Sequence, residues 1–200
     1  MATKPHLTFE DRFLEAVQFS RSLGVSVPKF EKTDTRLLTS TVLPQLDIYF
    51  LKFMEDKGPS VFFSQCINIH LALAKIMKKR LNLHPMFTIG SIKKGDSIGF
   101  PLTQADVSTW ARSGVGNPFG LSLHAWLTLP SMEIIDFTLR PSVIINNGLN
   151  RDSLRYDAKH WRDFLSIEYL PIATGEDLLE KLGFRMFDAQ VSGFDDFAPH

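Results

Sequence analysis

The chain has 200 residues, of which 44% are hydrophobic and 22% are charged. This composition supplies enough apolar surface for a folded core, so it excludes a chain that is disordered throughout, and the length suits one domain over residues 1–200. The 22 basic and 22 acidic residues cancel to a formal charge of zero. No overall field therefore draws the chain to nucleic acid or to an acidic membrane surface, and we expect neither as a partner.

The single cysteine, Cys66, excludes an internal disulfide, a cysteine-rich zinc module and an iron–sulfur cluster held by this chain alone. A lone thiol fits a reducing compartment. The first ten residues lack the apolar stretch of about 7 to 15 residues of a secretory signal, and no apolar run approaches the roughly 20 residues of a membrane span. We therefore expect a cytoplasmic protein.

Two helical segments are predicted in the first 60 residues. Apolar residues recur at helical spacing after Thr8, which is the expected N-cap with Asp11 at the third position, and Gly24 ends the helix. A second helical pattern covers residues 35–57 and contains Pro44, so it predicts two helices or one kinked helix. These first 60 residues are interpreted as a helical N-terminal extension.

A buried helix is predicted over residues 64–81, because its first half is apolar on nearly every side and its last turn carries three basic residues. Ser64 is the expected N-cap. This assignment places Cys66 in the first turn, at the positive end of the helix dipole.

Beyond Pro85 the sequence changes to the patterns of strands. The expected strands are 86–92, 121–129, 133–139 and 165–170, and the expected helices are 104–112, a short one around Trp161 and one from Thr174 to Gly183. The second and third of these strands form a hairpin. We therefore expect an α+β domain in which residues 61–140 carry the core motifs and residues 141–200 complete the fold, although the sequence from 184 onward gives no clear signal.

Three residues in these elements have the chemistry of a nucleophile, a base and an orienting acid. A thiol attacks as a thiolate, and a helix N-terminus and a neighbouring imidazolium are two common features that favour this form. His124 and Asp136 lie at positions of the same parity on the two hairpin strands, so we expect them to be diagonal neighbours on one face, about 7 to 8 Å apart between backbones. The order Cys66, His124, Asp136 therefore predicts a catalytic triad.

Three short segments resemble the motifs of the transglutaminase-like superfamily, a circular relative of papain-type folds. They are Ser-Gln-Cys-Ile-Asn at 64–68, Leu-His-Ala-Trp-Leu at 123–127 and Ile-Ile-Asp-Phe-Thr at 134–138. The resemblance covers residues 66–139, roughly the middle third of the chain. It implies a central helix that begins at the cysteine and packs on an antiparallel sheet, with extra helices at the N-terminal side.

The resemblance also implies a role for each site residue. Cys66 is similar to the nucleophile, His124 to the base and acid, and Asp136 to the residue that orients the imidazole. Gln65 and Trp126 are the candidates for substrate binding, with Gln65 near the oxyanion hole to which the Cys66 backbone N–H would contribute.

Two residues beside the cysteine depart from the motif. Many members have a small residue, often glycine, two positions before the cysteine and an aromatic or basic residue just after it. Here these positions hold Ser64 and Ile67. The departures concern the oxyanion hole and the acyl-side pocket rather than the triad.

The function implied is acyl transfer or amide hydrolysis through a thioester at Cys66, as in a transglutaminase, a protease or a deamidase. The substrate would be a protein, a peptide or a small amide, and this chemistry needs no metal or other cofactor. The sequence leaves open whether water or an amine takes the acyl group, and it leaves the oligomeric state open.

Two alternatives remain at this stage. The same fold could be a protein-binding module whose catalytic site has decayed, and the departures beside Cys66 favour that interpretation modestly. A metal-dependent hydrolase could instead use Cys66, His70 and His84, because His70 lies four residues after the cysteine on the same helical face.

Overall fold

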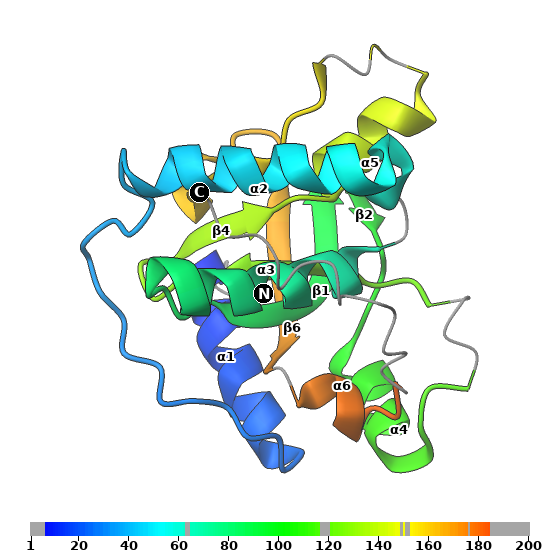
Figure 1. Cartoon of the computed structure of the whole chain (residues 1–200). Helices are drawn as coiled ribbons and strands as arrows, with labels where there is room; N and C mark the ends of the chain where they lie inside the picture. Colours follow the sequence, from blue (N-terminus) through cyan, green and yellow to red (C-terminus); the bar gives the residue numbers. More distant parts are fainter. Residues whose placement is uncertain are drawn as a thin grey trace.

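The structure of the chain is a computed structural model that describes residues 7–62, 65–116, 121–148, 150, 153–175 and 177–184. Its α-helices are α1 (Phe9–Ser22), α2 (Val42–Lys57), α3 (Cys66–Leu81), α4 (Gln104–Ser113), α5 (Leu139–Asn146) and α6 (Leu178–Lys181), with 3-10 turns η1 (Pro59–Phe62) and η4 (Trp161–Asp163) (Figure 1). Its strands are β1 (Met86–Lys94), β2 (Ser97–Gly99), β3 (His124–Thr128), β4 (Glu133–Asp136), β5 (Asp157–His160) and β6 (Glu168–Thr174).

All strand pairs in the described sheet are antiparallel, and β1 is its longest strand. One edge of β1 pairs with β6, and the other pairs first with β3 and then, at its end, with β2. From β3 the sheet continues through β4 to β5. Helices together with an antiparallel sheet make an α+β architecture, which confirms the predicted class.

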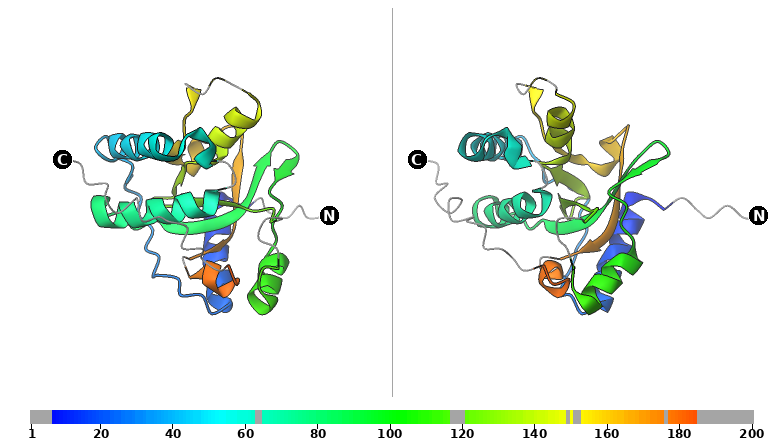
Figure 2. Two further views of the ribbon diagram at one scale, coloured as in Figure 1. Left: turned by 45° about the vertical axis from the view of Figure 1, so that its right-hand side comes forward. Right: turned by 90° about the vertical axis from the view of Figure 1, so that its right-hand side faces the viewer.

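Helices cover both faces of the sheet. Figure 2 shows α2 and α3 on one side and α1 on the other. On the α3 side, the main core contains Ala125, Leu127 and Ile135, while Trp126 and Ile134 belong to a second cluster on the α1 side. This alternation is the two-residue period of a strand, and it means that α1 completes one face of the sheet.

The start of the chain folds largely as its caps predict. Thr8 and Asp11 form a reciprocal capping box at the start of α1, which confirms that prediction. The predicted helix over 35–57 was wrong at its beginning, because α2 starts only at Val42. Pro44 then lies in the first turn, where its missing N–H removes no helical hydrogen bond and no kink is needed.

The second half of the chain follows the predicted types with shifted boundaries. The helix at 104–112 is confirmed as α4, with a capping box from Thr103. The strand predicted over 133–139 ends at Asp136, and α5 begins at Leu139. The strand predicted over 165–170 is β6, which runs to Thr174, so that residue is not the N-cap of the last helix.

The described residues exclude the C-terminal tail and contain no candidate membrane span. The unassigned tail beyond residue 184 lies outside the described residues. Among the residues that the structure describes, no helix combines the length and the apolar composition that a membrane crossing requires.

Candidate active site

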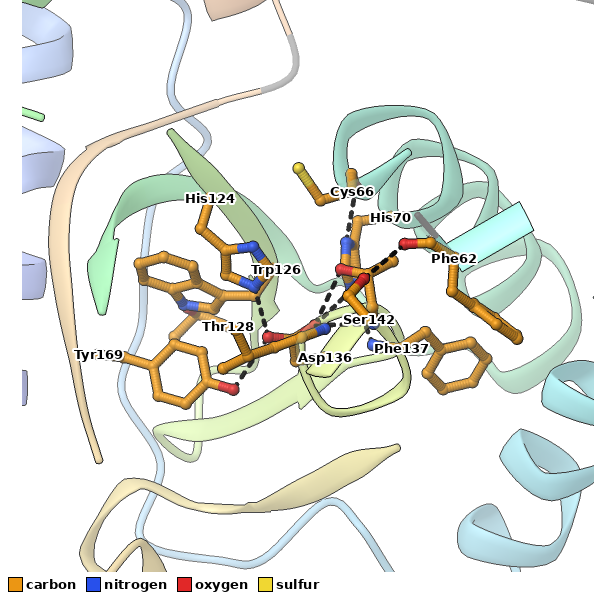
Figure 3. A network of polar contacts seen from close by, with 12 residues as sticks. Phe62, Cys66, His70, His124, Trp126, Thr128, Asp136, Phe137, Ser142 and Tyr169 are labelled. Atoms are coloured by element: carbon orange, nitrogen blue, oxygen red, sulfur yellow. Dashed lines mark hydrogen bonds and ion pairs between the residues drawn. The ribbon is translucent and has the colours of Figure 1, made fainter. Parts of the chain in front are cut away.

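Cys66 is the first residue of α3, and its half-buried side chain points from the helix start toward the side on which His124 lies (Figure 3). The N-cap is Gln65, without a side-chain cap bond, and the predicted cap Ser64 lies outside the described residues. The backbone N–H groups of the first helical turn have no intrahelical acceptor. They give the sulfur an electropositive surrounding.

His124 and Asp136 are brought together by the hairpin of β3 and β4. The register pairs Leu127 with Ile135, and extending it by one residue places Asp136 opposite Trp126, diagonal to His124. The His124 Nε2 atom lies 2.6 Å from Asp136 Oδ2, and both side chains are buried. The predicted diagonal contact is therefore confirmed.

The Asp136 carboxylate accepts hydrogen bonds at both oxygens. Oδ1 accepts from the backbone N–H of Thr138 at 2.9 Å, from its hydroxyl at 3.1 Å, and from the N–H of Leu139 at 3.0 Å. Oδ2 accepts from His124 and from the Tyr169 hydroxyl at 2.9 Å. The Asp-Phe-Thr segment therefore forms a turn that fixes the carboxylate beneath the imidazole (Figure 3).

Burial and charge oppose each other in this pair. Burial alone would raise the pKa of Asp136, but the positive charge and hydrogen bond of His124 lower it well below its ordinary value. Burial alone would lower the pKa of His124, but the charge and hydrogen bond of Asp136, followed by a hydrogen bond and charge from the Cys66 side chain, raise it to about 10. His124 is therefore an imidazolium at neutral pH.

Asp136 uses only one of the two ring nitrogens of His124. Nε2 is engaged by Asp136, which leaves Nδ1 as the nitrogen available to the Cys66 side chain that contributes to the raised pKa of His124. The Cys66 side chain therefore acts electrostatically on an imidazole that a carboxylate already holds. This is the arrangement that a base needs when it shuttles a proton to and from a sulfur nucleophile.

His70 joins the start of α3 to the end of β4. Its Nδ1 atom lies 2.6 Å from the Cys66 carbonyl oxygen, which can only accept, so Nδ1 carries the proton. Its Nε2 atom accepts from the Phe137 N–H at 3.0 Å. Complete burial lowers the pKa of His70 to about 4, despite the nearby charge of Asp136. His70 is thus a neutral link that holds the nucleophile helix against the Asp136 turn.

We expect the neutral His70 to make stability fall as the solution is acidified. Between pH 6.5 and 4 the unfolded chain binds a proton at this histidine and the native chain does not, so the free energy of unfolding decreases as pH falls. Urea unfolding at the two pH values should show that the wild-type protein loses about 3 kcal/mol more of its free energy of unfolding than His70→Gln does. The glutamine amide can make both hydrogen bonds and does not titrate. Equal losses in the two proteins would contradict a buried neutral His70.

The predicted metal site of Cys66, His70 and His84 is not assembled. Both ring nitrogens of His70 are engaged by the backbone, and His84 is exposed beyond the far end of α3. A helix of 16 residues separates the outer two ligands by about 24 Å. Among the described residues, no group of three or more His, Cys, Asp or Glu side chains is placed to hold a metal.

The two predicted substrate-binding residues occupy different surroundings. Gln65 is exposed beside Cys66, and its Oε1 atom accepts from Asn68 at 2.7 Å. Trp126 is fully buried, its ring centroid lies 6.1 Å from that of His124, and its Nε1–H donates to Thr128. In this conformation Trp126 supports the imidazole from within the core rather than facing a substrate.

Tyr169 is the site residue that sequence reasoning missed. It lies on β6, 33 residues after Asp136 along the chain, and its hydroxyl completes the carboxylate's hydrogen bonds. Burial and the nearby carboxylates of Asp136 and Asp157 raise its pKa well above the usual value, so Tyr169 remains a donor. No local motif marks it, because only the pairing of β6 with β1 brings it to the hairpin.

Comparisons of the chain with protein-family models, with curated proteins and with solved structures find no match.

Proposed function

We propose that the chain is a cysteine-dependent acyltransferase or amide hydrolase with a transglutaminase-like fold. The observation that carries the proposal is the buried imidazole of His124, whose Nε2 atom lies 2.6 Å from the Asp136 carboxylate and whose pKa is raised in part by the Cys66 side chain. A carboxylate with five hydrogen-bond donors is a costly feature to bury. The complete set of hydrogen bonds to the buried Asp136 carboxylate favours a working catalytic site over a decayed one.

The first half of the proposed reaction forms a thioester. The Cys66 thiolate attacks the carbonyl carbon of an amide, and the resulting oxyanion faces the backbone N–H groups of the first turn of α3, including that of Cys66, which have no acceptor within the helix. His124 gives its proton to the leaving nitrogen as the carbon–nitrogen bond breaks. Asp136 keeps the imidazole oriented and balances its charge.

The second half regenerates the enzyme. Neutral His124 accepts a proton from water or from a second amine while that nucleophile attacks the thioester carbonyl. The carbon–sulfur bond then breaks and restores the thiolate beside the imidazolium. Hydrolysis, deamidation and crosslinking share these steps and differ only in the amide and in the acceptor.

The proposal is tested by trapping the intermediate with an activated acyl donor, p-nitrophenyl acetate. We expect rapid release of p-nitrophenol and an acetyl group on Cys66, located by intact-mass and peptide mass spectrometry and removable by hydroxylamine. His84→Ala, which replaces an exposed histidine away from the site, should acetylate at the wild-type rate. If Cys66 is not acetylated, or if it is acetylated equally fast in His124→Ala, the proposed enzyme function is wrong and the protein-binding module is the better interpretation.

A further inference from the structure

Phe100 covers the candidate base from the solvent side. It follows β2, its ring centroid lies 5.1 Å from that of His124 with the rings inclined by 30°, and its side chain is 40% exposed. His124 itself is only 3% exposed. The imidazolium therefore has the buried ring of Trp126 on the core side and the half-exposed ring of Phe100 at the surface.

The backbone holds Phe100 in an unfavourable conformation. Its φ is 54°, in the left-handed region that bulky side chains rarely adopt, and the following residue is Pro101, which restricts it further. Both flanks are fixed, because Gly99 pairs with Ile92 in the sheet and the Leu102 N–H donates to the Ser91 hydroxyl. Such strain persists only where the surroundings impose it, and it is concentrated at functional sites.

The contact with His124 indicates which part of a substrate would meet Phe100. In the proposed reaction His124 gives its proton to the leaving nitrogen, so the group attached to that nitrogen must lie on the His124 side of the scissile bond. By microscopic reversibility, an incoming amine occupies the same place. Ile98, two residues earlier on β2, is also an exposed apolar residue, at 55% exposure.

We propose that Phe100 forms an apolar wall that selects the leaving or acceptor amine, so that the preferred amine carries an aromatic or branched apolar group. This inference rests on the proposed function, and it makes Phe100 a specificity-determining residue of that site. An open apolar wall should discriminate by about tenfold, the low end of what an apolar contact supplies.

The test compares two primary amines of similar basicity, benzylamine and 2-methoxyethylamine, as acceptors from acetyl-Cys66. The thiolate takes the acetyl group from p-nitrophenyl acetate, and p-nitrophenol leaves with the proton of His124. The amine then attacks the thioester carbonyl, returns a proton to His124 and releases the thiolate. The measured quantity is the ratio of amide formed to acetate formed, in which differences in acylation rate cancel.

We expect the wild-type ratio to be about tenfold higher for benzylamine than for 2-methoxyethylamine. Phe100→Ala should bring the two ratios close together, Phe100→Leu should retain part of the difference, and Leu165→Ala, which removes a fully exposed apolar side chain elsewhere, should leave it unchanged. Equal ratios in the wild type, or an undiminished preference in Phe100→Ala, would overturn the inference while leaving the thioester mechanism intact. Absence of acetyl-Cys66 would overturn the proposed function and the inference together.

Discussion

Replacement of Cys66 by alanine should abolish acyl transfer, with a fall in rate of at least about a thousandfold. No other cysteine exists in the chain to form the thioester. The thermal midpoint should move little, because the side chain is half-buried and alanine is a good helix former, and a stability change within about 1 kcal/mol is expected. Turnover of p-nitrophenyl acetate and calorimetric unfolding measure the two quantities.

The comparison between these two readouts separates a nucleophile from a packing residue. A nucleophile loses activity with the fold intact, whereas a packing cysteine loses stability first. Ile76→Ala, near the far end of α3, is the control, because it removes buried apolar volume from the same helix without removing the thiol. A Cys66→Ala protein that retains activity would remove the thioester from the mechanism.

Asp136→Asn should lower the rate by on the order of 10⁴-fold with little change in KM. Asparagine has one acceptor oxygen, whereas the carboxylate uses both. If the amide nitrogen replaces Oδ1 it faces the donors of Thr138 and Leu139, and if it replaces Oδ2 it faces those of His124 and Tyr169. In either orientation a buried donor loses its acceptor and the imidazolium loses its counter-charge.

The same substitution should lower the free energy of unfolding by about 3 kcal/mol or more, the usual cost of breaking a buried ion pair. Urea unfolding and steady-state kinetics of one preparation give both values. Asp106→Asn, in the capping box of α4, exchanges a carboxylate for an amide away from the site and should leave the kinetics unchanged. Wild-type rates in Asp136→Asn would mean that another group orients His124. Glu133 does not fill that role here, because it binds the backbone N–H groups of Leu37 and Leu38.

Features that depend on neighbours in the sequence could be predicted. The capping box of Thr8 and Asp11 requires only four consecutive residues. The contact between His124 and Asp136 requires only a hairpin with a short turn. Side chains alternate between the two faces of a strand, so the turn length decides that these two residues lie on the same face of the sheet. Local chemistry and strand geometry were sufficient to place the candidate base and its orienting acid.

Other features depend on tertiary packing, and local patterns misrepresented them. No element was predicted at Val143, Ile144 and Ile145, whose β-branched composition is typical of a strand, and they form α5. His70 has the spacing of a metal ligand relative to Cys66, but its ring turns to the Cys66 carbonyl and to the next strand end. Helical spacing fixes the face of a side chain and not its hydrogen-bond partner.

Tyr169 and Phe100 show the same limit at longer range. Tyr169 reaches Asp136 only because β6 pairs with β1, and that pairing has no signature in either strand. Phe100 reaches His124 only because the short β2 strand and the Leu102 contact fix its backbone. Both lie outside the three motifs that marked the triad.

The central claim is that Cys66 and His124 form a thiolate–imidazolium pair in the resting protein, and the pH dependence of Cys66 alkylation by iodoacetamide tests it most directly. Against the effect of burial, the charge and hydrogen bond of Asp136 raise the pKa of His124 to about 10, so the imidazolium should persist from about pH 5 to 8. An ion pair with Cys66 then predicts a wild-type rate that is nearly constant across that range. His124→Ala should instead react slowly at low pH and accelerate steeply as pH rises, as an ordinary thiol does. A wild-type profile that already rises in that way would contradict the ion pair.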